Sequence, residues 1–331
     1  MVLLVGGSLH LIAARVKALV TGGAGFIGSH IAEGLCRRGA RVVVLDNLCL
    51  GSAENLAWKR AGDELEFVKG DVTDGRLVGD LVRGCDWVFH EAALPSVPVS
   101  VEKPIETNQQ NLDATLQLLV AARDAKVKRF MFASSSAIYG DSEAAVKRER
   151  DMPLPLSPYG LQKFTSEKYA QMFFHLYGLE TVSFRYFNVF GPRQSFDSPY
   201  SGVIAKFCTL MLAGKAPTIF GDGKQSRDFV SIRNVVEANL LGAERPRNLV
   251  AGQVFNIGTG TSINLLDLLD ELNRQTKQNL RPNFGPARAG DVRSSQADIS
   301  AAREGLGYEA KVTWQQGLEE TLDFYRRGNG K

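Results

Sequence analysis

The chain has 331 residues, 44% of them hydrophobic, so it can bury one large core or divide into two lobes. Its 39 Lys and Arg residues nearly balance 36 Asp and Glu residues, and the basic residues are spread along the chain rather than gathered in runs. This charge pattern argues against nucleic acid or a membrane surface as a partner.

Four cysteines, Cys36, Cys49, Cys85 and Cys208, form no CxxC pair and lie among apolar or turn residues, which is typical of reduced thiols in a cytoplasmic protein. No segment reaches the roughly 18 consecutive apolar residues that a membrane-spanning helix needs. Residues 1–15 lack the basic start and the cleavage site of a signal peptide. We expect them to form an extension ahead of a domain that begins at Val16.

From Val16 onward, short β-branched runs alternate with helical stretches, a pattern typical of a parallel sheet with crossover helices. Most predicted strands are continuous apolar runs, as strands buried on both faces should be. We expect strands at Lys17–Val20, Arg41–Leu45, Leu65–Lys69, Trp87–His90, Arg129–Ala133, Thr181–Tyr186 and Val254–Ile257. We expect helices at Ile27–Arg38, Arg76–Arg83, Asn111–Ala125 and Pro158–Tyr177.

After Asn188 the rhythm changes to loops rich in Gly, Pro and polar residues, which indicates a second lobe. The strand at Val254 is expected to return to the sheet, so the domains are discontinuous in sequence. The predicted fold is α/β, with a Rossmann-type doubly wound parallel sheet and a smaller, mixed α/β C-terminal substrate lobe. We place the first domain at residues 16–190 plus about 228–258, and the second at 191–227 and 259–331.

Two of the predicted helices carry apolar residues on more than one face. In the helix at Asn111 these are Leu112, Leu116, Leu118 and Leu119; in the helix at Pro158 they are Phe164, Tyr169, Met172, Phe173, Phe174 and Leu176. Either the helices are wedged between the sheet and the second lobe, or they form a dimer interface. A homodimer is expected on the second interpretation.

A glycine-rich turn follows the first predicted strand and leads into a helix; it reads Thr21-Gly22-Gly23-Ala24-Gly25-Phe26-Ile27-Gly28. Glycines at this spacing let the chain turn tightly and let backbone N–H groups approach a pyrophosphate. Asp46, at the end of the second strand, can accept hydrogen bonds from an adenosine ribose and repels a 2′-phosphate, while Asn47 adds no positive charge. The pattern predicts a site for NAD rather than NADP, unless Asp46 is only a turn residue.

Tyr159 and Lys163 form a Tyr-x-x-x-Lys pair near the start of a predicted helix, so the phenol and the ammonium share one helix face. The ammonium and a positive nicotinamide ring are expected to lower the tyrosine pKa toward the range of a general base. Ser134-Ser135-Ser136 follows a buried strand, where the ligand crevice of an open sheet lies. The combination predicts a catalytic site.

Together these residues resemble the extended short-chain dehydrogenase/reductases, and the resemblance runs from about Val16 to Tyr325. The matching motifs are Thr21–Gly28, Gly70-Asp71-Val72, His90-Glu91-Ala92-Ala93, Asn111, the serine strand, Tyr159 with Lys163, and Arg185–Pro192. Within this group the chain is most similar to NAD-dependent nucleotide-sugar epimerases. The resemblance implies cofactor contacts from Gly22, Gly25, Phe26, Ile27, Gly28, Asp46, Asn47, Asp71, Val72, Ala92, Ala93, Asn111, Tyr159, Lys163 and Tyr186.

By the same resemblance, Tyr159 takes the proton from a sugar 4-hydroxyl, and its hydroxyl partner is Ser135 or Ser136. Counting back four residues from Tyr139, as in hexose 4-epimerases, selects Ser135, but the segment is one residue shorter than in many relatives, so both stay open. The implied substrate contacts are Ser96, Ser135, Tyr159, Asn188, Gln194, Arg227, Arg288 and Ser295, with Arg227 and Arg288 on the uridine diphosphate.

Related dehydratases and decarboxylases carry an acidic residue just after the strand hydroxyl, where this chain has Ser136 and Ala137. That difference favours an epimerase, which needs no further acid or base. Ser295 lies where hexose-restricted epimerases carry a tyrosine beside the sugar 2-position, so a small residue leaves room for an acetamido group. We expect C4 epimerisation of UDP-N-acetylglucosamine and UDP-N-acetylgalactosamine, with UDP-glucose and UDP-galactose as a further pair.

Two alternatives stay open. One is a net oxidoreductase or decarboxylase acting on a related nucleotide sugar. The other is a non-catalytic NAD-binding regulator, since fold alone does not give activity, although the presence of both Tyr159 and Lys163 argues against it. No metal site is expected.

Overall fold

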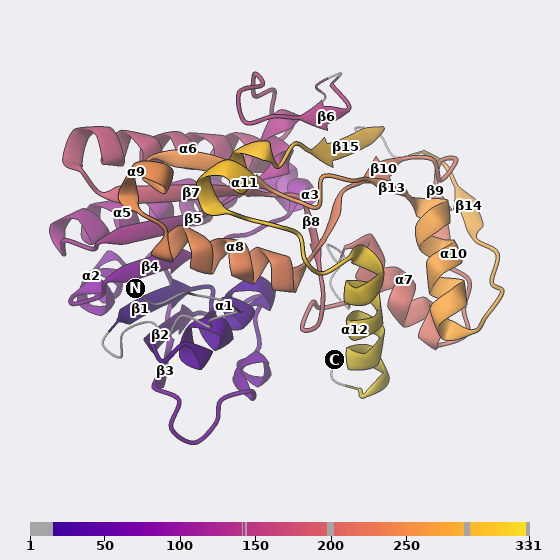
Figure 1. The fold of residues 1–331 in the computed structure, drawn as a ribbon, viewed down its shortest axis with the longest axis horizontal. Coiled ribbons are helices and arrows are strands. Elements are labelled where there is room, and N and C mark those ends of the chain that lie inside the picture. The colour runs from indigo at the N-terminus through magenta and orange to yellow at the C-terminus, as the bar shows by residue number, and fades with distance from the viewer. Residues whose placement is uncertain (1–15, 141, 143, 197–201, 288–291, 329–331) are drawn as a thin grey trace, which may run out of the picture.

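The structure is a computed structural model that describes residues 16–140, 142, 144–196, 202–287 and 292–328. A seven-stranded parallel sheet with the strand order β12-β7-β5-β4-β1-β2-β3 forms the larger part of the molecule (Figure 1). Its strands are β1 (Lys17–Thr21), β2 (Arg41–Asp46), β3 (Leu65–Lys69), β4 (Trp87–His90), β5 (Arg129–Ser135), β7 (Glu180–Tyr186) and β12 (Gln253–Ile257). All seven predicted strands are present, and β12 joins the sheet at its edge.

Helices cover both faces of this sheet. One face packs against α1 (Phe26–Arg37), α8 (Ile232–Glu244) and α11 (Ser300–Leu306), and the other against α2 (Gly75–Val82), α5 (Ala114–Asp124) and α6 (Pro158–Tyr177). Each face has its own apolar core: Val20 of β1 belongs to the first and its neighbour Leu19 to the second, because successive strand residues point to opposite faces. The predicted doubly wound α/β architecture is confirmed.

A smaller lobe of helices and short strands lies to the right of the sheet in Figure 1. Helices α7 (Val203–Leu212), α10 (Leu265–Thr276) and α12 (Trp314–Arg326) share a third apolar core. The strands outside the large sheet form three small sheets; they are β6 (Val146–Lys147), β8 (Asn188–Phe190), β9 (Thr218–Phe220), β10 (Ser226–Arg227), β11 (Phe229–Ser231), β13 (Ile263–Asn264), β14 (Asn283–Gly285) and β15 (Ser294–Ala297). The domain boundaries stay a prediction, and the N-terminal extension at residues 1–15 lies outside the described residues.

Short helical segments connect the larger elements. They are η1 (Ala53–Leu56), α3 (Val97–Glu102), α4 (Pro104–Asn108), η2 (Gln109–Asp113), η3 (Ser136–Tyr139) and α9 (Arg247–Val250). The segment η2 is a π-helical turn, so the helix predicted at Asn111–Ala125 begins as a wider turn and becomes α-helical at Ala114. Such turns are often found next to functional sites.

Helix α6, which carries Tyr159 and Lys163, has the ends that its sequence predicts. The Ser157 side chain accepts a hydrogen bond from Gly160 N, and Pro158 occupies the first turn, where a missing N–H costs nothing. The helix ends at Gly178, whose φ of +74° suits glycine. The local sequence therefore fixes where the helix starts, and with it the depth of Tyr159 in the molecule.

All four cysteines are free; Cys49 is exposed and the other three are buried. A cytoplasmic location stays a prediction. Within the described ranges, every helix is too short or too polar to cross a membrane.

Candidate active site

A large pocket lies at the carboxyl ends of the central strands, where the strand order reverses between β1 and β4. Of the residues predicted to bind cofactor or substrate, it is lined by Gly22, Gly25, Phe26, Ile27, Gly28, Asp46, Asn47, Val72, Ala92, Ala93, Ser96, Tyr159, Lys163, Tyr186 and Gln194. The pocket lining does not include Asp71, Asn111, Ser135, Ser136, Asn188, Arg227 or Ser295. Arg288 lies outside the described residues.

The glycine turn makes a cradle that only glycine can form. Gly22 has a φ of +66°, and a Cβ on it would lie 2.7 Å from the Ala92 backbone nitrogen. A Cβ on Gly28 would lie 2.3 Å from the Gly22 carbonyl oxygen. Helix α1 begins directly after Gly25, so its free N–H groups lie at the pocket wall. This arrangement fits the pyrophosphate of a dinucleotide.

Asp46 holds the loops on this side of the pocket. One carboxylate oxygen accepts a hydrogen bond from Ala24 N at 3.0 Å and the other accepts one from Leu48 N at 2.8 Å. Because a carboxylate oxygen can accept more than one hydrogen bond, Asp46 keeps capacity for a ribose hydroxyl. The turn role and the predicted ribose role are thus compatible.

The segment after Asp46 also lines the pocket, next to the predicted ribose ligand. Its lining residues carry no motif and were not predicted: Cys49, Leu50, Gly51, Ser52 and Asn55. It is tied to the glycine turn, because Ser52 N and Asn55 Nδ2 both donate to the Ala24 carbonyl oxygen. Its position directly after the predicted ribose ligand is the one signal that the sequence offers.

Two residues predicted to bind the cofactor lie behind the pocket wall. Asp71 accepts a hydrogen bond from Asn47 Nδ2 at 2.7 Å. Asn111 accepts one from Leu94 N at 2.7 Å and donates to Gln162 Oε1 at 2.8 Å. Both side chains therefore bind pocket-lining segments, and their contact with a cofactor stays a prediction.

At the other end of the pocket, Tyr159 and Lys163 lie on one face of α6 as predicted. The Lys163 ammonium donates to the Ala133 carbonyl oxygen at 2.8 Å and lies over the Phe132 ring, 5.0 Å from its centroid. Burial raises the pKa of Tyr159 to about 12 and lowers that of Lys163 to about 8. Burial penalises the phenolate more than the protein groups around it stabilise it. The lowering predicted from the sequence also depends on the charge of a nicotinamide ring, and it stays a prediction.

The structure distinguishes between the two candidate serines. Ser135, the last residue of β5, is the serine whose side chain acts to lower the pKa of Tyr159 against the effect of burial. Its Oγ also accepts a hydrogen bond from Ala137 N at 3.1 Å. Ser136 begins the turn η3. Ser135 is therefore favoured over Ser136 as the hydroxyl partner of the tyrosine.

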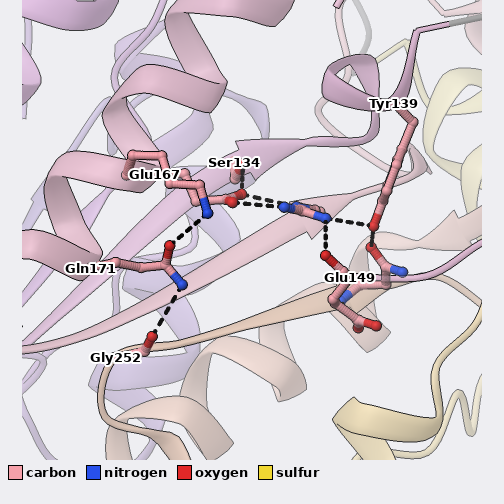
Figure 2. Close-up of polar contacts among 9 residues, drawn as sticks. Ser134, Tyr139, Glu149, Glu167, Gln171 and Gly252 are labelled. Carbon is pink, nitrogen blue, oxygen red and sulfur yellow. Dashed lines mark hydrogen bonds and ion pairs between the residues drawn. The ribbon is translucent and has the colours of Figure 1, made fainter. Parts of the chain in front are cut away.

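A buried polar network supports this end of the pocket (Figure 2). The Glu167 carboxylate accepts hydrogen bonds from Ser134 Oγ at 2.8 Å and from Arg185 Nε at 2.9 Å. Arg185 also donates to the Tyr139 hydroxyl at 2.8 Å and to the Glu149 carbonyl oxygen at 3.1 Å. The network joins β5, α6 and β7, the three elements that position Tyr159, Lys163 and Ser135.

Glu91 is a pocket residue to which no role was predicted, although its motif was noted. Its Oε1 accepts a hydrogen bond from the Tyr186 hydroxyl at 3.0 Å, and that hydroxyl accepts one from Asn239 Nδ2 at 2.7 Å. Burial raises the pKa of Glu91 to about 7. Nothing in the local pattern of the sequence distinguishes this carboxyl from a surface glutamate.

The predicted substrate residues of the smaller lobe lie on short strands. Arg227 of β10 and Ser295 of β15 are directly paired in a parallel register. Asn188 begins β8, and its N–H donates to the Asp228 carbonyl oxygen at 3.0 Å. The structure thus places Arg227 and Ser295 next to each other, and the roles of all three residues stay predictions.

Comparison with known proteins agrees with this geometry. The model of the NAD-dependent epimerase/dehydratase family matches residues 18–258. The chain belongs to this family. NAD is accordingly its cofactor, and the glycine cradle of this member suits that molecule sterically.

Among the relatives in this epimerase/dehydratase family, the UDP-glucose 4-epimerase of Mycolicibacterium smegmatis is 39% identical over 94% of this chain and 99% of the relative. The UDP-N-acetyl-alpha-D-glucosaminuronate decarboxylase of Bacillus cytotoxicus is 31% identical over 94% of this chain and 98% of the length of the relative. A solved structure of the UDP-N-acetylglucosamine 4-epimerase from Methanobrevibacter ruminantium, in complex with UDP-N-acetylmuramic acid, is 37% identical with a TM-score of 0.90. The structural match covers 95% of this chain and 99% of the chain of the Methanobrevibacter ruminantium enzyme.

Proposed function

We propose that the protein is an NAD-dependent UDP-sugar 4-epimerase that interconverts UDP-N-acetylglucosamine and UDP-N-acetylgalactosamine, with UDP-glucose and UDP-galactose as further substrates. The observation that carries this proposal is that Tyr159 and Lys163 lie together in the pocket wall, where Lys163 binds the end of β5 that carries Ser135. Ala137 stands where elimination chemistry needs an acid. One base and one hydroxyl are sufficient for reversible oxidation at C4.

In this mechanism, Tyr159 takes the proton of the sugar 4-hydroxyl and later returns it. Ser135 would hydrogen-bond to the same reacting oxygen, and the Lys163 ammonium, which donates to the Ala133 carbonyl oxygen, would add positive charge at this end of the pocket. NAD bound in this pocket would supply a hydride acceptor for C4 and a positive charge, and that charge would lower the pKa of Tyr159 from about 12. Inversion follows when the ketone turns and C4 regains the hydride on its other face.

The proposed preference for acetylated sugars rests on Ser295 and on Arg227, the residue with which it pairs. Arg227, its partner across the strands, is the proposed ligand of the diphosphate, together with Arg288 outside the described residues and Asn188. A guanidinium binds a phosphate through two parallel hydrogen bonds. A serine beside it leaves space at the sugar 2-position for an acetamido group. Gln194 and Ser96 line the pocket and complete the proposed sugar site.

A decarboxylase is the second candidate, because the relative from Bacillus cytotoxicus carries that name. A decarboxylase would convert a UDP-N-acetylhexuronate to a pentose with release of carbon dioxide. The missing acidic residue after the strand serine argues against it. Product analysis with the uronate substrate distinguishes the two reactions.

We also propose that a second copy of the chain binds across α6. Leu161, Met172 and Leu176 are 53%, 49% and 64% exposed, and their spacing places them on one helix face. The neighbouring α4 adds Ile105, which is 76% exposed. A patch of this kind marks an interaction surface. Light scattering should give the mass of a dimer for the wild type and of a monomer for Leu176→Glu with Ile105→Glu; a wild-type monomer contradicts the proposal.

The reaction is tested by incubating the purified protein, without added cofactor, with UDP-N-acetylglucosamine and separately with UDP-glucose. The anomeric proton signals are followed by NMR. The 4-epimer should accumulate in both samples without net NADH, and faster with the acetylated sugar. Unchanged spectra in both samples would overturn the proposed function, and faster turnover of UDP-glucose would overturn the substrate preference.

A further inference from the structure

The Glu91 carboxyl lies in the pocket wall at the same end as Tyr159 and Lys163. Glu91 directly follows β4, which ends at His90, whereas Tyr159 and Lys163 come from α6. The hydroxyl group that donates to Glu91 belongs to Tyr186 of β7. The proton transfers proposed for Tyr159 need no carboxyl group. A charged carboxyl group that is largely withdrawn from water is costly to maintain unless it is paired, so its presence in the pocket wall calls for a role.

The groups that face Glu91 come from three elements. From β7, the Tyr186 hydroxyl donates to it at 3.0 Å, and from α8, Asn239 holds that hydroxyl in place. From α6, the Lys163 ammonium and the Tyr159 phenol interact with it electrostatically. On its own segment the preceding His90 is turned away and contacts Thr21 and Thr115. Lys163 is therefore the cation that faces this carboxyl within the described part of the chain.

Burial and these partners oppose each other at Glu91. Burial raises its pKa to about 7, while the Tyr186 hydrogen bond and the Lys163 charge act to lower it. The carboxyl therefore gains or loses its charge close to neutral pH. Ionisation of Glu91 therefore changes the electrostatic potential at the end of the pocket where Tyr159 lies.

We propose that Glu91 is a positioning residue that acts as the charge partner of the nicotinamide end of NAD, stabilising the positive oxidised form over the neutral reduced form. This inference rests on the proposed function in one respect: hydride is exchanged at the end of the pocket where Tyr159 lies. The oxidised ring carries one positive charge that the reduced ring lacks, so an anion in the same low-dielectric wall binds the oxidised form more tightly. The consequence is a bias toward return of the hydride to the sugar, which keeps the enzyme from being left in the reduced state.

The test compares the affinities of NAD⁺ and NADH for the full chain by isothermal titration calorimetry between pH 6 and pH 8, with no sugar present. The ratio of the NADH dissociation constant to that of NAD⁺ should rise with pH in the wild type by about tenfold, the effect of one pKa unit of coupling. In Glu91→Gln, which keeps an acceptor for Tyr186, the ratio should be lower and should rise much less with pH, because only Lys163, with a pKa of about 8, then titrates at this end of the pocket. Equal ratios and slopes in both proteins would overturn the inference.

Two further variants keep the test decisive. Glu149→Gln is the matched control, because burial also raises the pKa of Glu149 but its side chain accepts from Asn256 N outside the pocket. Glu149→Gln should show the same ratio and the same pH dependence as the wild type.

Tyr186→Phe removes the hydrogen bond that lowers the pKa of Glu91, so the rise of the dissociation-constant ratio should move to higher pH. This variant tests the inference even if Glu91→Gln fails to fold. An unmoved rise would overturn the inference, and because no sugar is present, a wrong substrate assignment would leave the result unchanged.

Discussion

Arg185 of β7 and Glu167 of α6 form an ion pair whose side chains are 2% and 0% exposed. Glu167 lies four residues beyond Lys163, one turn along the same helix, so the pair binds the catalytic helix to the sheet. Figure 2 shows the same carboxylate binding Ser134, the residue before Ser135. The positions of the proposed base Tyr159, of Lys163 and of Ser135 therefore depend on one buried charge pair.

Glu167→Gln should destabilise the fold strongly. The substitution leaves the Arg185 guanidinium buried without its counter-charge, and breaking a buried pair in this way costs about 3–5 kcal/mol. Denaturant unfolding measures the loss. Asp80→Asn, which breaks the exposed pair between Asp80 and Arg83, should cost less than about 1 kcal/mol. Similar losses for the two variants would contradict the role given to the buried pair.

Tyr159→Phe should abolish most activity while NAD binding persists. Removing a general base lowers rates by roughly 10²–10⁴-fold, whereas the glycine cradle and Asp46 are untouched. Epimerisation rates and NAD affinity are measured on the same preparation. The exposed Tyr177, on the same helix, gives the control Tyr177→Phe, which should keep its rate. A Tyr159→Phe enzyme with an undiminished rate would exclude Tyr159 as the base.

Ser295→Tyr should shift the substrate preference toward plain hexoses. A tyrosine beside Arg227 fills the space proposed for the acetamido group, so kcat/KM for UDP-N-acetylglucosamine should fall by at least about tenfold while that for UDP-glucose changes less. Ser295→Ala, which stays small, should keep the acetylated preference. If Ser295→Tyr left the ratio of the two kcat/KM values unchanged, Ser295 would have no part in specificity.

Acid should destabilise the protein partly through His90. Burial lowers the pKa of His90 to about 3, so between pH 6.5 and pH 3 the unfolded chain binds a proton that the folded chain does not. Stability from this residue is thus present above pH 6.5 and is lost as the pH falls. The loss from pH 7 to pH 5 should be about 2 kcal/mol smaller in His90→Gln than in the wild type, by denaturant unfolding at both values. The exposed His175 supplies the control His175→Gln, and an equal loss in His90→Gln and the wild type would contradict the assignment.

The neutral state of His90 also follows from its partners. The Thr115 hydroxyl donates to the Asn111 carbonyl oxygen, so it accepts from His90 Nε2, and Nδ1 then accepts from Thr21. A second proton on the ring would face a hydroxyl hydrogen. The hydrogen-bond pattern and burial therefore act in the same direction on the pKa of His90.

Much of the fold and the cofactor site could be predicted because it depends on local patterns. Apolar runs predicted the strands to within a few residues, and the glycine spacing predicted a turn in which Gly22 and Gly28 have no room for a side chain. The cap at Ser157 and Pro158 predicted the start of α6. These features are set by neighbours in the sequence.

The rest depends on contacts between distant segments. The role of Ser135 over Ser136 follows from the rotation of the chain at the end of β5, and the direction of the Tyr159 pKa follows from how deeply α6 is buried. Glu91 became a candidate only when Tyr186, far along the chain, was found to donate to it. Burial and cross-chain hydrogen bonds of this kind leave no periodic signal in the sequence.

The most direct test of the central claim uses UDP-N-acetylglucosamine carrying deuterium at C4, in ordinary water with no added cofactor. A hydride that leaves C4 and returns to the same carbon should leave the deuterium in the UDP-N-acetylgalactosamine product, as NMR and mass spectrometry would show. A product that has lost its deuterium to solvent, or a stoichiometric release of NADH, would contradict the proposed epimerase.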